Sequence, residues 1–148
     1  MITIRSATIR DALRLYVWRN HPTTRAMFRN TAPISWESHV EWLKLALFNL
    51  SRILYIVERD DDPVGTARLD LDGVEAEVSV TIAPEARGAG IGTEALRLLR
   101  DEAFESHVLQ RLVARIKVEN GASIKAFERA GFVERFRTET EVTLIATR

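Results

Sequence analysis

Three glycines in the stretch "PEARGAGIGTEAL", residues 84–96, follow an arginine and precede a helical pattern. Because they lack side chains, Gly88, Gly90 and Gly92 allow the backbone to approach a ligand closely. The first N–H groups of a helix lack intrahelical partners, and the helix dipole favours an anion beside them. Arg87 adds a guanidinium whose fork suits phosphate oxygens. The stretch therefore predicts a phosphate-binding loop, and a tight turn from strand to helix without a ligand is the alternative.

Two other glycine-rich phosphate loops do not fit this stretch. A P-loop ends in Gly-Lys-Ser/Thr, and the segment "GIGT" contains no lysine. The dinucleotide pattern G-x-G-x-x-G requires a glycine at position 93, where Thr93 stands. That pattern also belongs to an early strand of a parallel sheet, whereas antiparallel strands are predicted before this loop.

A second polar segment, "VENGASIKAFERAGF" at residues 118–132, begins about 28 residues after the glycines. Asn120 stands where a helix N-cap is expected, and Gly131 suits the left-handed residue that ends a helix. Asn120 can therefore serve as a cap, as a ligand contact, or as both.

The surrounding elements alternate between period-2 and period-3.6 apolar patterns, with turns at "RDDDP" and "DLDG". The segment "NHPTTR" at residues 20–25 is predicted to end the first helix. Strands are predicted at 1–5, 52–58, 64–71, 76–83, 111–118, 132–137 and 141–147. Helices are predicted from residue 11, over 34–50, after the glycines to about residue 106, and over 121–130.

The apolar residues of the three longest predicted helices indicate which sides are buried. They are Leu13, Tyr16 and Val17 in the first helix, Trp36, Val40, Leu43 and Leu47 in the second, and Ile91, Ala95, Leu98, Leu99 and Ala103 in the third.

These elements predict one α/β (α+β) domain over residues 1–148. Its sheet is mixed and mostly antiparallel, with about seven strands and about four flanking helices. One strand–helix–strand crossover at the glycine loop is expected to be parallel and right-handed.

Composition limits the classes of function. The chain has 148 residues, 46% of them hydrophobic and 28% charged, with a formal net charge of zero. This balance argues against nucleic acid as a partner, because such binders carry a basic excess. The absence of cysteine and the scattered positions of His21, His39 and His107 predict no metal site. Neither a membrane span nor a signal peptide is evident, so we expect a cytoplasmic protein.

The combination of Arg-x-x-Gly-x-Gly, at Arg87, Gly90 and Gly92, with the later "VENGASIKAFERAGF" resembles the two signatures of the GNAT family of N-acetyltransferases. The resemblance covers nearly the whole chain. The segments "IRSATIRDALRLYVWRNHPTTR" and "ISWESHVEWL" resemble the branch that acetylates ribosomal-protein N-termini and the branch that acetylates nucleotide-linked amino sugars.

The resemblance implies acetyl-CoA as the acetyl donor and no metal. Its pyrophosphate would lie on the backbone N–H groups of the loop, and its pantetheine would pair with the strand that ends near Ile82. Phe127 stands where many family members carry a tyrosine that protonates the leaving thiolate. Phenylalanine cannot do so. The residues implied to bind acetyl-CoA are Ile82, Ala83, Arg87, Gly88, Ala89, Gly90, Ile91, Gly92, Thr93, Asn120, Ser123 and Phe127.

The expected reaction is direct attack of an amine on the thioester. Glu77 is the preferred general base over Glu75, and a solvated strand end is the alternative for both residues. Ser123 could donate a hydrogen bond to the leaving thiolate, whose conjugate-acid pKa of about 8.5 makes strong acid catalysis optional. Its alternative role is that of a first-turn helix residue.

The acceptor amine is expected to bind near Trp18, Arg19, Trp36 and His39, with Trp42 beside His39. The alternative for His39 is helix packing or a capping contact, and the alternative for Trp18 and Arg19 is a helix C-terminus with a favourable cation. The acceptor is expected to be a small-molecule amine, including an amino sugar, or a peptide N-terminus. A homodimer is compatible with the exposed terminal strand. Two other readings remain open: a sensor that binds acetyl-CoA without turnover, and an unrelated nucleotide-phosphate binder.

Overall fold

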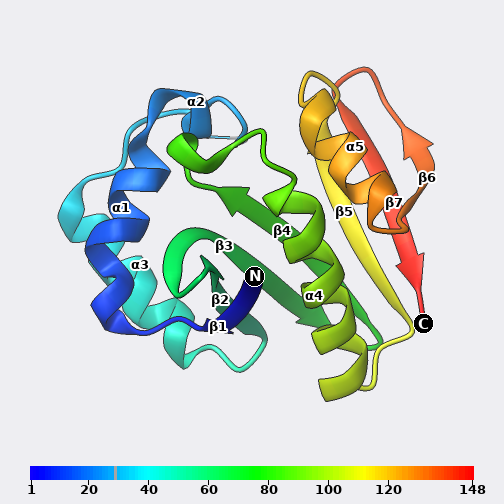
Figure 1. Ribbon diagram of the computed structural model, residues 1–148, viewed down its shortest axis with the longest axis horizontal. Coiled ribbons are helices and arrows are strands. Elements are labelled where there is room, and N and C mark those ends of the chain that lie inside the picture. The colour runs from blue at the N-terminus through cyan, green and yellow to red at the C-terminus, as the bar shows by residue number, and fades with distance from the viewer. Residues whose placement is uncertain (29) are drawn as a thin grey trace.

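Seven strands form one continuous sheet in the order β1-β2-β3-β4-β5-β7-β6 (Figure 1). The computed structural model describes residues 1–28 and 30–148. Every strand predicted from the sequence is present, which confirms the mixed sheet. The strands are β1 (Ile2–Ser6), β2 (Arg52–Arg59), β3 (Asp62–Asp72), β4 (Glu75–Ile82), β5 (Arg111–Lys117), β6 (Val133–Arg137) and β7 (Glu141–Thr147).

The neighbours β4 and β5 are the parallel pair that the crossover predicts. They pair only at their first residues, Glu75–Glu77 with Arg111–Val113. Beyond these residues the two strands diverge, as Figure 1 shows. The edge of β4 that faces β5 is therefore left without a strand partner over most of its length, at its C-terminal end.

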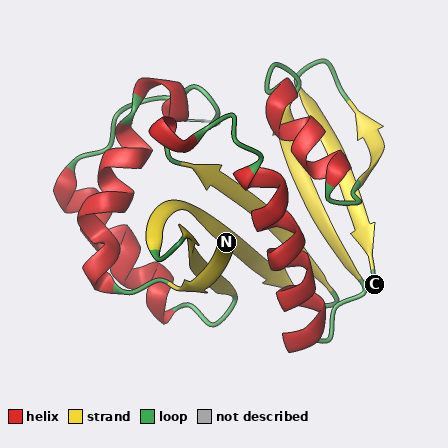
Figure 2. Ribbon diagram, in the orientation of Figure 1, coloured by secondary structure: helices red, strands yellow, loops and turns green. Residues whose placement is uncertain are grey.

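The helices cover both faces of this sheet (Figure 2). Four of them match the predicted helices, and the fifth, α2, lies in the segment predicted only to end the first helix. Pro22 occupies its first turn, and the His21 imidazole accepts a hydrogen bond from the Thr23 N–H. The helices are α1 (Ala12–Asn20), α2 (Pro22–Arg25), α3 (Trp36–Phe48), α4 (Ile91–Ser106) and α5 (Gly121–Arg129), with 3-10 turns η1 (Ile9–Asp11) and η2 (Pro84–Ala86).

Helix α4 packs its predicted side onto the sheet. Ile91, Ala95, Leu99 and Ala103 are all buried there, against strands that contribute fully buried aliphatic side chains. This packing fixes the N-terminus of α4 beside the end of β4, where the two strands diverge.

The predicted sides of α1 and α3 are wrong. In α1 the buried residues are Ala12, Leu15 and Trp18, one position from the predicted set, whereas Leu13 and Val17 are exposed. In α3 the residue Leu43 is buried as predicted. Its neighbours on that side are His39 and Ala46, not Trp36 and Leu47, which are 40% and 36% exposed. Among the described residues, no helix has the length and apolar character needed to span a bilayer.

Candidate active site

The glycine loop presents open backbone at the start of α4. Gly88 and Gly90 have φ values of 83° and 76°, in the left-handed region that disfavours side chains. A Cβ at either position would meet nothing within 4 Å, so the space beside them is free. Gly90 is the N-cap of α4 and provides no side-chain cap. The first N–H groups of a 16-residue helix are therefore left to an anionic ligand.

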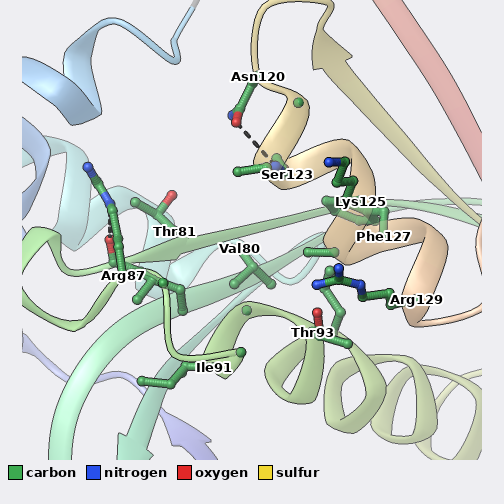
Figure 3. A pocket seen from close by; sticks show the side chains of 18 of the residues that line it. Val80, Thr81, Arg87, Ile91, Thr93, Asn120, Ser123, Lys125, Phe127 and Arg129 are labelled. Atoms are coloured by element: carbon green, nitrogen blue, oxygen red, sulfur yellow. Dashed lines mark hydrogen bonds between the residues drawn. The ribbon is translucent and has the colours of Figure 1, made fainter.

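A cavity of about 580 Å³ lies in front of this helix end, and we call it the donor cavity. The loop, β4, α4 and α5 all contribute to its wall (Figure 3). It opens where β4 and β5 diverge. The structure gathers in it Ile82, Arg87, Gly88, Gly90, Ile91, Gly92, Thr93, Asn120, Ser123 and Phe127, all of which were predicted to bind the donor.

Two residues predicted for the same role, Ala83 and Ala89, do not line the cavity. Ala83 is 1% exposed, and its N–H donates to the Val64 carbonyl at 2.7 Å. That N–H is therefore unavailable to a bound pantetheine. Ala89 is an exposed loop residue between the two left-handed glycines.

The guanidinium of Arg87 is occupied by protein groups. Its Nε donates to the Ile82 carbonyl at 3.0 Å, and its two Nη atoms donate to the hydroxyls of Thr23 and Thr24, each at 2.6 Å. Arg87 thus joins the end of β4, the glycine loop and α2. Burial lowers the pKa of this guanidinium. Arg87 therefore braces the loop through three of its five N–H groups, and its contact with phosphate stays a prediction.

Two cations that the sequence analysis did not single out, Lys125 and Arg129, lie on α5 and line the donor cavity (Figure 3). They stand four residues apart, so they share one side of the helix. Their i, i+4 spacing within the predicted helix 121–130 could have revealed them as a pair of neighbouring cations. With Arg87, they make the wall of the donor cavity positively charged.

The start of α5 has the predicted cap. The Asn120 Oδ1 accepts from the Ser123 N–H at 3.2 Å, while both residues line the donor cavity. At the other end Gly131, with φ of 95°, closes the helix: its N–H donates to the Glu128 carbonyl, and the Phe132 N–H donates to the Phe127 carbonyl. Phe127 is buried against Phe132 at the cavity wall.

Glu77, the predicted general base, lies outside the donor cavity and outside a second, smaller cavity beside α1 and α3. It is the last β4 residue paired with β5, and its carboxylate accepts a hydrogen bond from Arg115 of β5. The structure therefore places Glu77 in an ion pair at the junction of the two strands.

A second cavity of about 290 Å³ lies beside α1 and α3, and we call it the acceptor cavity. Trp18, Arg19 and His39, three of the four residues predicted to bind the acceptor, line it. Trp36 does not; its ring packs edge-on against Tyr16 at 5.3 Å. Trp42, expected beside His39, also lines it. The lining residues that the sequence analysis did not single out are Leu15, Thr24, Phe28, Ile34, Leu54, Thr66, Arg68, Ser79 and Thr81.

His39 is a neutral part of this wall. It is 2% exposed, and its Nε2 donates to the Ala12 carbonyl at 2.9 Å. Burial, with a smaller effect from the Arg19 charge, lowers the pKa of the imidazole. A neutral ring that donates through Nε2 keeps an acceptor lone pair on Nδ1.

One residue, Thr81 of β4, lines both cavities. The donor cavity and the acceptor cavity therefore meet across a single strand, close to the end where β4 leaves β5. Thr81 is thus the point at which the walls of the two cavities join.

A family model described as an acetyltransferase (GNAT) domain matches residues 1–133. The chain belongs to the GNAT acetyltransferase family. It is thus an N-acetyltransferase with acetyl-CoA as co-substrate, as the resemblance implied. The GNAT chain is also 27% identical, over 141 residues, to the uncharacterized N-acetyltransferase p20 of Bacillus licheniformis. That match covers 88% of this chain and 78% of p20.

Solved structures share the fold of this GNAT chain. The aminoglycoside acetyltransferase AAC(6')-Ib with coenzyme A and kanamycin superposes with a TM-score of 0.89 at 21% identity, over 100% of this chain and 95% of that one. The Vibrio cholerae spermidine N-acetyltransferase with CoA and spermine gives 0.89 at 19% identity, over 99% and 95%. A Methanocaldococcus jannaschii domain gives 0.86 at 25% identity, over 100% and 99%.

Proposed function

We propose that this enzyme transfers the acetyl group from acetyl-CoA in the donor cavity to a small primary amine in the acceptor cavity. The observation that carries the proposal is Thr81, which lines both cavities. Gly88, Gly90 and the N-terminus of α4 hold the pyrophosphate, with Lys125 and Arg129 neutralising its charge. The free edge of β4 accompanies the pantetheine arm and directs the thioester toward Thr81.

The amine attacks the thioester carbon directly, forming the C–N bond as the C–S bond breaks. No carboxylate of the described residues lines either cavity. An amine of low pKa, such as a peptide α-amine at about 7.7–8.0, is partly neutral near pH 7 and needs no strong base. The proton that it loses passes to the hydroxyls of Thr81 and Ser79 and on to solvent. Ser123 lines the donor cavity and serves as hydrogen-bond donor to the thiolate.

An amino sugar and a peptide N-terminus both satisfy this chemistry. A peptide would enter the acceptor cavity only with its first residue, because the cavity holds about 290 Å³. An assay of thiol release from acetyl-CoA, with peptides of varied N-termini in one pool and amino sugars in another, separates the two. If neither pool nor any other amine releases thiol while acetyl-CoA binds, the protein is a sensor and the proposed transfer is wrong.

Filling the acceptor cavity should stop transfer and leave donor binding intact. Thr66 of β3 lines only the acceptor cavity and pairs with Thr81 across the strands. We expect Thr66→Phe to lower kcat/KM for the amine by about 10-fold or more, since the added ring occupies the acceptor volume and overpacks by about 1–3 kcal/mol. Steady-state kinetics and an acetyl-CoA titration measure the two effects.

The matched control is Thr143→Phe, the same change at a partly buried residue of β7 that lines neither cavity. It should retain activity. Equal losses of activity in the two variants would show that the ring harms the fold and that this cavity does not take the acceptor.

The missing tyrosine gives a further test. Phe127 lines the donor cavity beside the Asn120 and Ser123 end of α5. If protonation of the thiolate limits turnover, Phe127→Tyr should raise kcat by about 100-fold, at the lower end of general acid catalysis. Pre-steady-state and steady-state measurement of thiol release checks this, and unchanged kcat at every pH from 6 to 9 would mean that protonation is not limiting.

A further inference from the structure

The arginines around the acceptor cavity are short of hydrogen-bond partners. Within residues 1–28 and 30–148, three buried side-chain polar atoms have none: Nη1 of Arg19, Nε of Arg25 and Nε of Arg68. Arg19 and Arg68 both line the acceptor cavity. Buried donors are nearly always satisfied in native proteins, so three unsatisfied guanidinium atoms in one region indicate a missing acceptor group.

Arg19 has an aromatic neighbour but no carboxylate partner among the described residues. Its guanidinium lies over the ring of Phe28, with Cζ 4.0 Å from the ring centroid. Burial, and then the nearby Arg25 charge, lower its pKa, which means that the folded protein holds this cation at a cost. A bound anion would offset that cost.

Arg68 contacts one carboxylate, that of Asp70, which also pairs with a second arginine. Its Nε lies 3.1 Å from the Asp70 Oδ2, without hydrogen-bond geometry. The same Asp70 accepts a hydrogen bond from Arg52 at 2.7 Å. One carboxylate thus faces two guanidinium groups, so the acceptor cavity keeps an excess of positive charge that no lining residue balances.

Much of the remaining wall is apolar. Its apolar side chains are Leu15, Trp18, Phe28, Ile34, Trp42 and Leu54, and three threonines, Ser79 and His39 complete it. Its rim at Ile34 is held by Asn20, whose side-chain amide donates to the Ile34 carbonyl at 2.7 Å and accepts from the Ile34 N–H at 2.9 Å. Such a wall suits an apolar or ring-shaped body, fixed in orientation by a few polar groups.

We propose that the acceptor is a small primary amine that also carries an anionic group, a carboxylate or a phosphate. Arg19 and Arg68 bind the anion, the tryptophans contact the body of the molecule, and the amine points to Thr81 and the thioester. This assignment rests on the proposed function. It also predicts that polycationic amines are poor acceptors, because the cavity offers them two cations and no carboxylate.

The test compares acceptors that differ only in the anion. The wild-type enzyme is assayed by thiol release with phenylalanine against phenethylamine, with glucosamine 6-phosphate against glucosamine, and with spermidine and kanamycin as polycations. We expect one anionic member to exceed its partner by about 10- to 100-fold in kcat/KM, the usual value of hydrogen bonds to a charged group. The pair that shows the preference identifies the anion as carboxylate or phosphate.

Variants of Arg19 test whether this residue causes the preference for the anionic acceptor. Arg19→Met should reduce the preferred pair's ratio to about twofold or less, and Arg19→Lys should keep part of it, since lysine restores charge without the fork. Arg14→Met is the control: Arg14 is on the same helix, is half-exposed and lies 3.9 Å from Asp62. It should leave the ratio unchanged. Acetyl-CoA affinity, measured in each variant, shows whether the donor cavity is intact.

Several results would overturn the proposal. They are equal rates for both members of both pairs, faster acetylation of spermidine or kanamycin, or a ratio that survives Arg19→Met. A further contrary result is that no anionic amine is acetylated and none changes the tryptophan fluorescence, since Trp18 and Trp42 line this cavity. In each case transfer to another amine would leave the proposed function standing. Absence of transfer to every amine would end both.

Discussion

Replacing Gly90 with glutamate is expected to abolish acetyl-CoA binding while the protein stays folded. The new side chain would enter the open space at the N-cap of α4, where nothing lies within 4 Å. Its carboxylate would occupy the position of the pyrophosphate and repel the remaining phosphates. We expect affinity to fall by about 100-fold or more, since like charges at short range in a partly buried site cost several kcal/mol. Isothermal titration calorimetry measures the loss.

The control for Gly90→Glu is Gly73→Glu. Gly73 lies in the turn between β3 and β4, has φ of 62° and also has nothing within 4 Å of its Cβ position. Both variants therefore carry the same backbone strain, of roughly 1–2 kcal/mol, and the same new charge. Gly73→Glu should lose stability and keep acetyl-CoA affinity. If the two variants bind acetyl-CoA equally well, the glycine loop does not hold the pyrophosphate.

Removing the Arg87 side chain is expected to weaken both binding steps. Its guanidinium links the donor cavity to Thr24, which is 1% exposed and lines the acceptor cavity. In Arg87→Met the Thr24 hydroxyl and the Ile82 carbonyl lose their partner. We expect the free energy of unfolding to fall by about 1–3 kcal/mol and kcat/KM to fall by about 10- to 100-fold for both substrates. Chemical denaturation and steady-state kinetics measure these losses.

A double-mutant cycle separates this brace from a direct contact with the donor. Thr24→Val removes the hydroxyl that accepts from Arg87 and leaves the donor cavity lining unchanged. If Arg87 acts as a brace, the losses in Arg87→Met and Thr24→Val should not add. Additive losses, with Thr24→Val affecting the amine only, would return Arg87 to the role of phosphate ligand. Arg137→Met, on exposed β6, controls for the loss of one surface cation.

A helix or strand can be predicted from the sequence where the pattern of its own residues determines its structure. Each predicted strand has its alternation or apolar run, and α4 has its apolar residues on one side. The Asn120 cap and the Gly131 end of α5 are local interactions, so both could be read from neighbouring residues. The glycine loop follows from backbone freedom alone, and the observed φ values at Gly88 and Gly90 agree with that prediction.

The predicted buried side of a helix is wrong where the residues that it packs against are far away in the chain. His39 is polar, and the periodicity of α3 gives no reason to bury it. It is buried because the Ala12 carbonyl, 27 residues earlier, accepts its N–H. Aromatic residues on two sides of the same helix, Trp36 and Trp42, make the apolar side ambiguous. Trp36 stays at the surface, where its ring packs edge-on against the ring of Tyr16.

The partners of charged residues also could not be predicted from the sequence, because they too lie far away in the chain. Glu77 and Arg115 are 38 residues apart, and only the register of β4 on β5 brings them together. Arg87 reaches Thr23 and Thr24, more than 60 residues away, through the position of a four-residue helix that no apolar pattern announces. The acceptor cavity is also assembled from α1, α2, α3, β2, β3 and β4, with Phe28 and Ile34 from the stretch between α2 and α3, so its residues share no spacing in sequence.

The short paired segment between β4 and β5, which we call the seam, makes the stability of this fold depend on its co-substrate. Among the described residues, three pairs join the part of the sheet built by β1 to β4 to the part built by β5 to β7. In the proposed binding mode, pantetheine would fill the gap beyond the seam and contact both parts. The free energy of unfolding then includes the binding free energy, by about 2.7 kcal/mol at a ligand concentration 100 times Kd. In that binding mode, the supply of acetyl-CoA would set the free energy of unfolding of the enzyme as well as its rate of turnover.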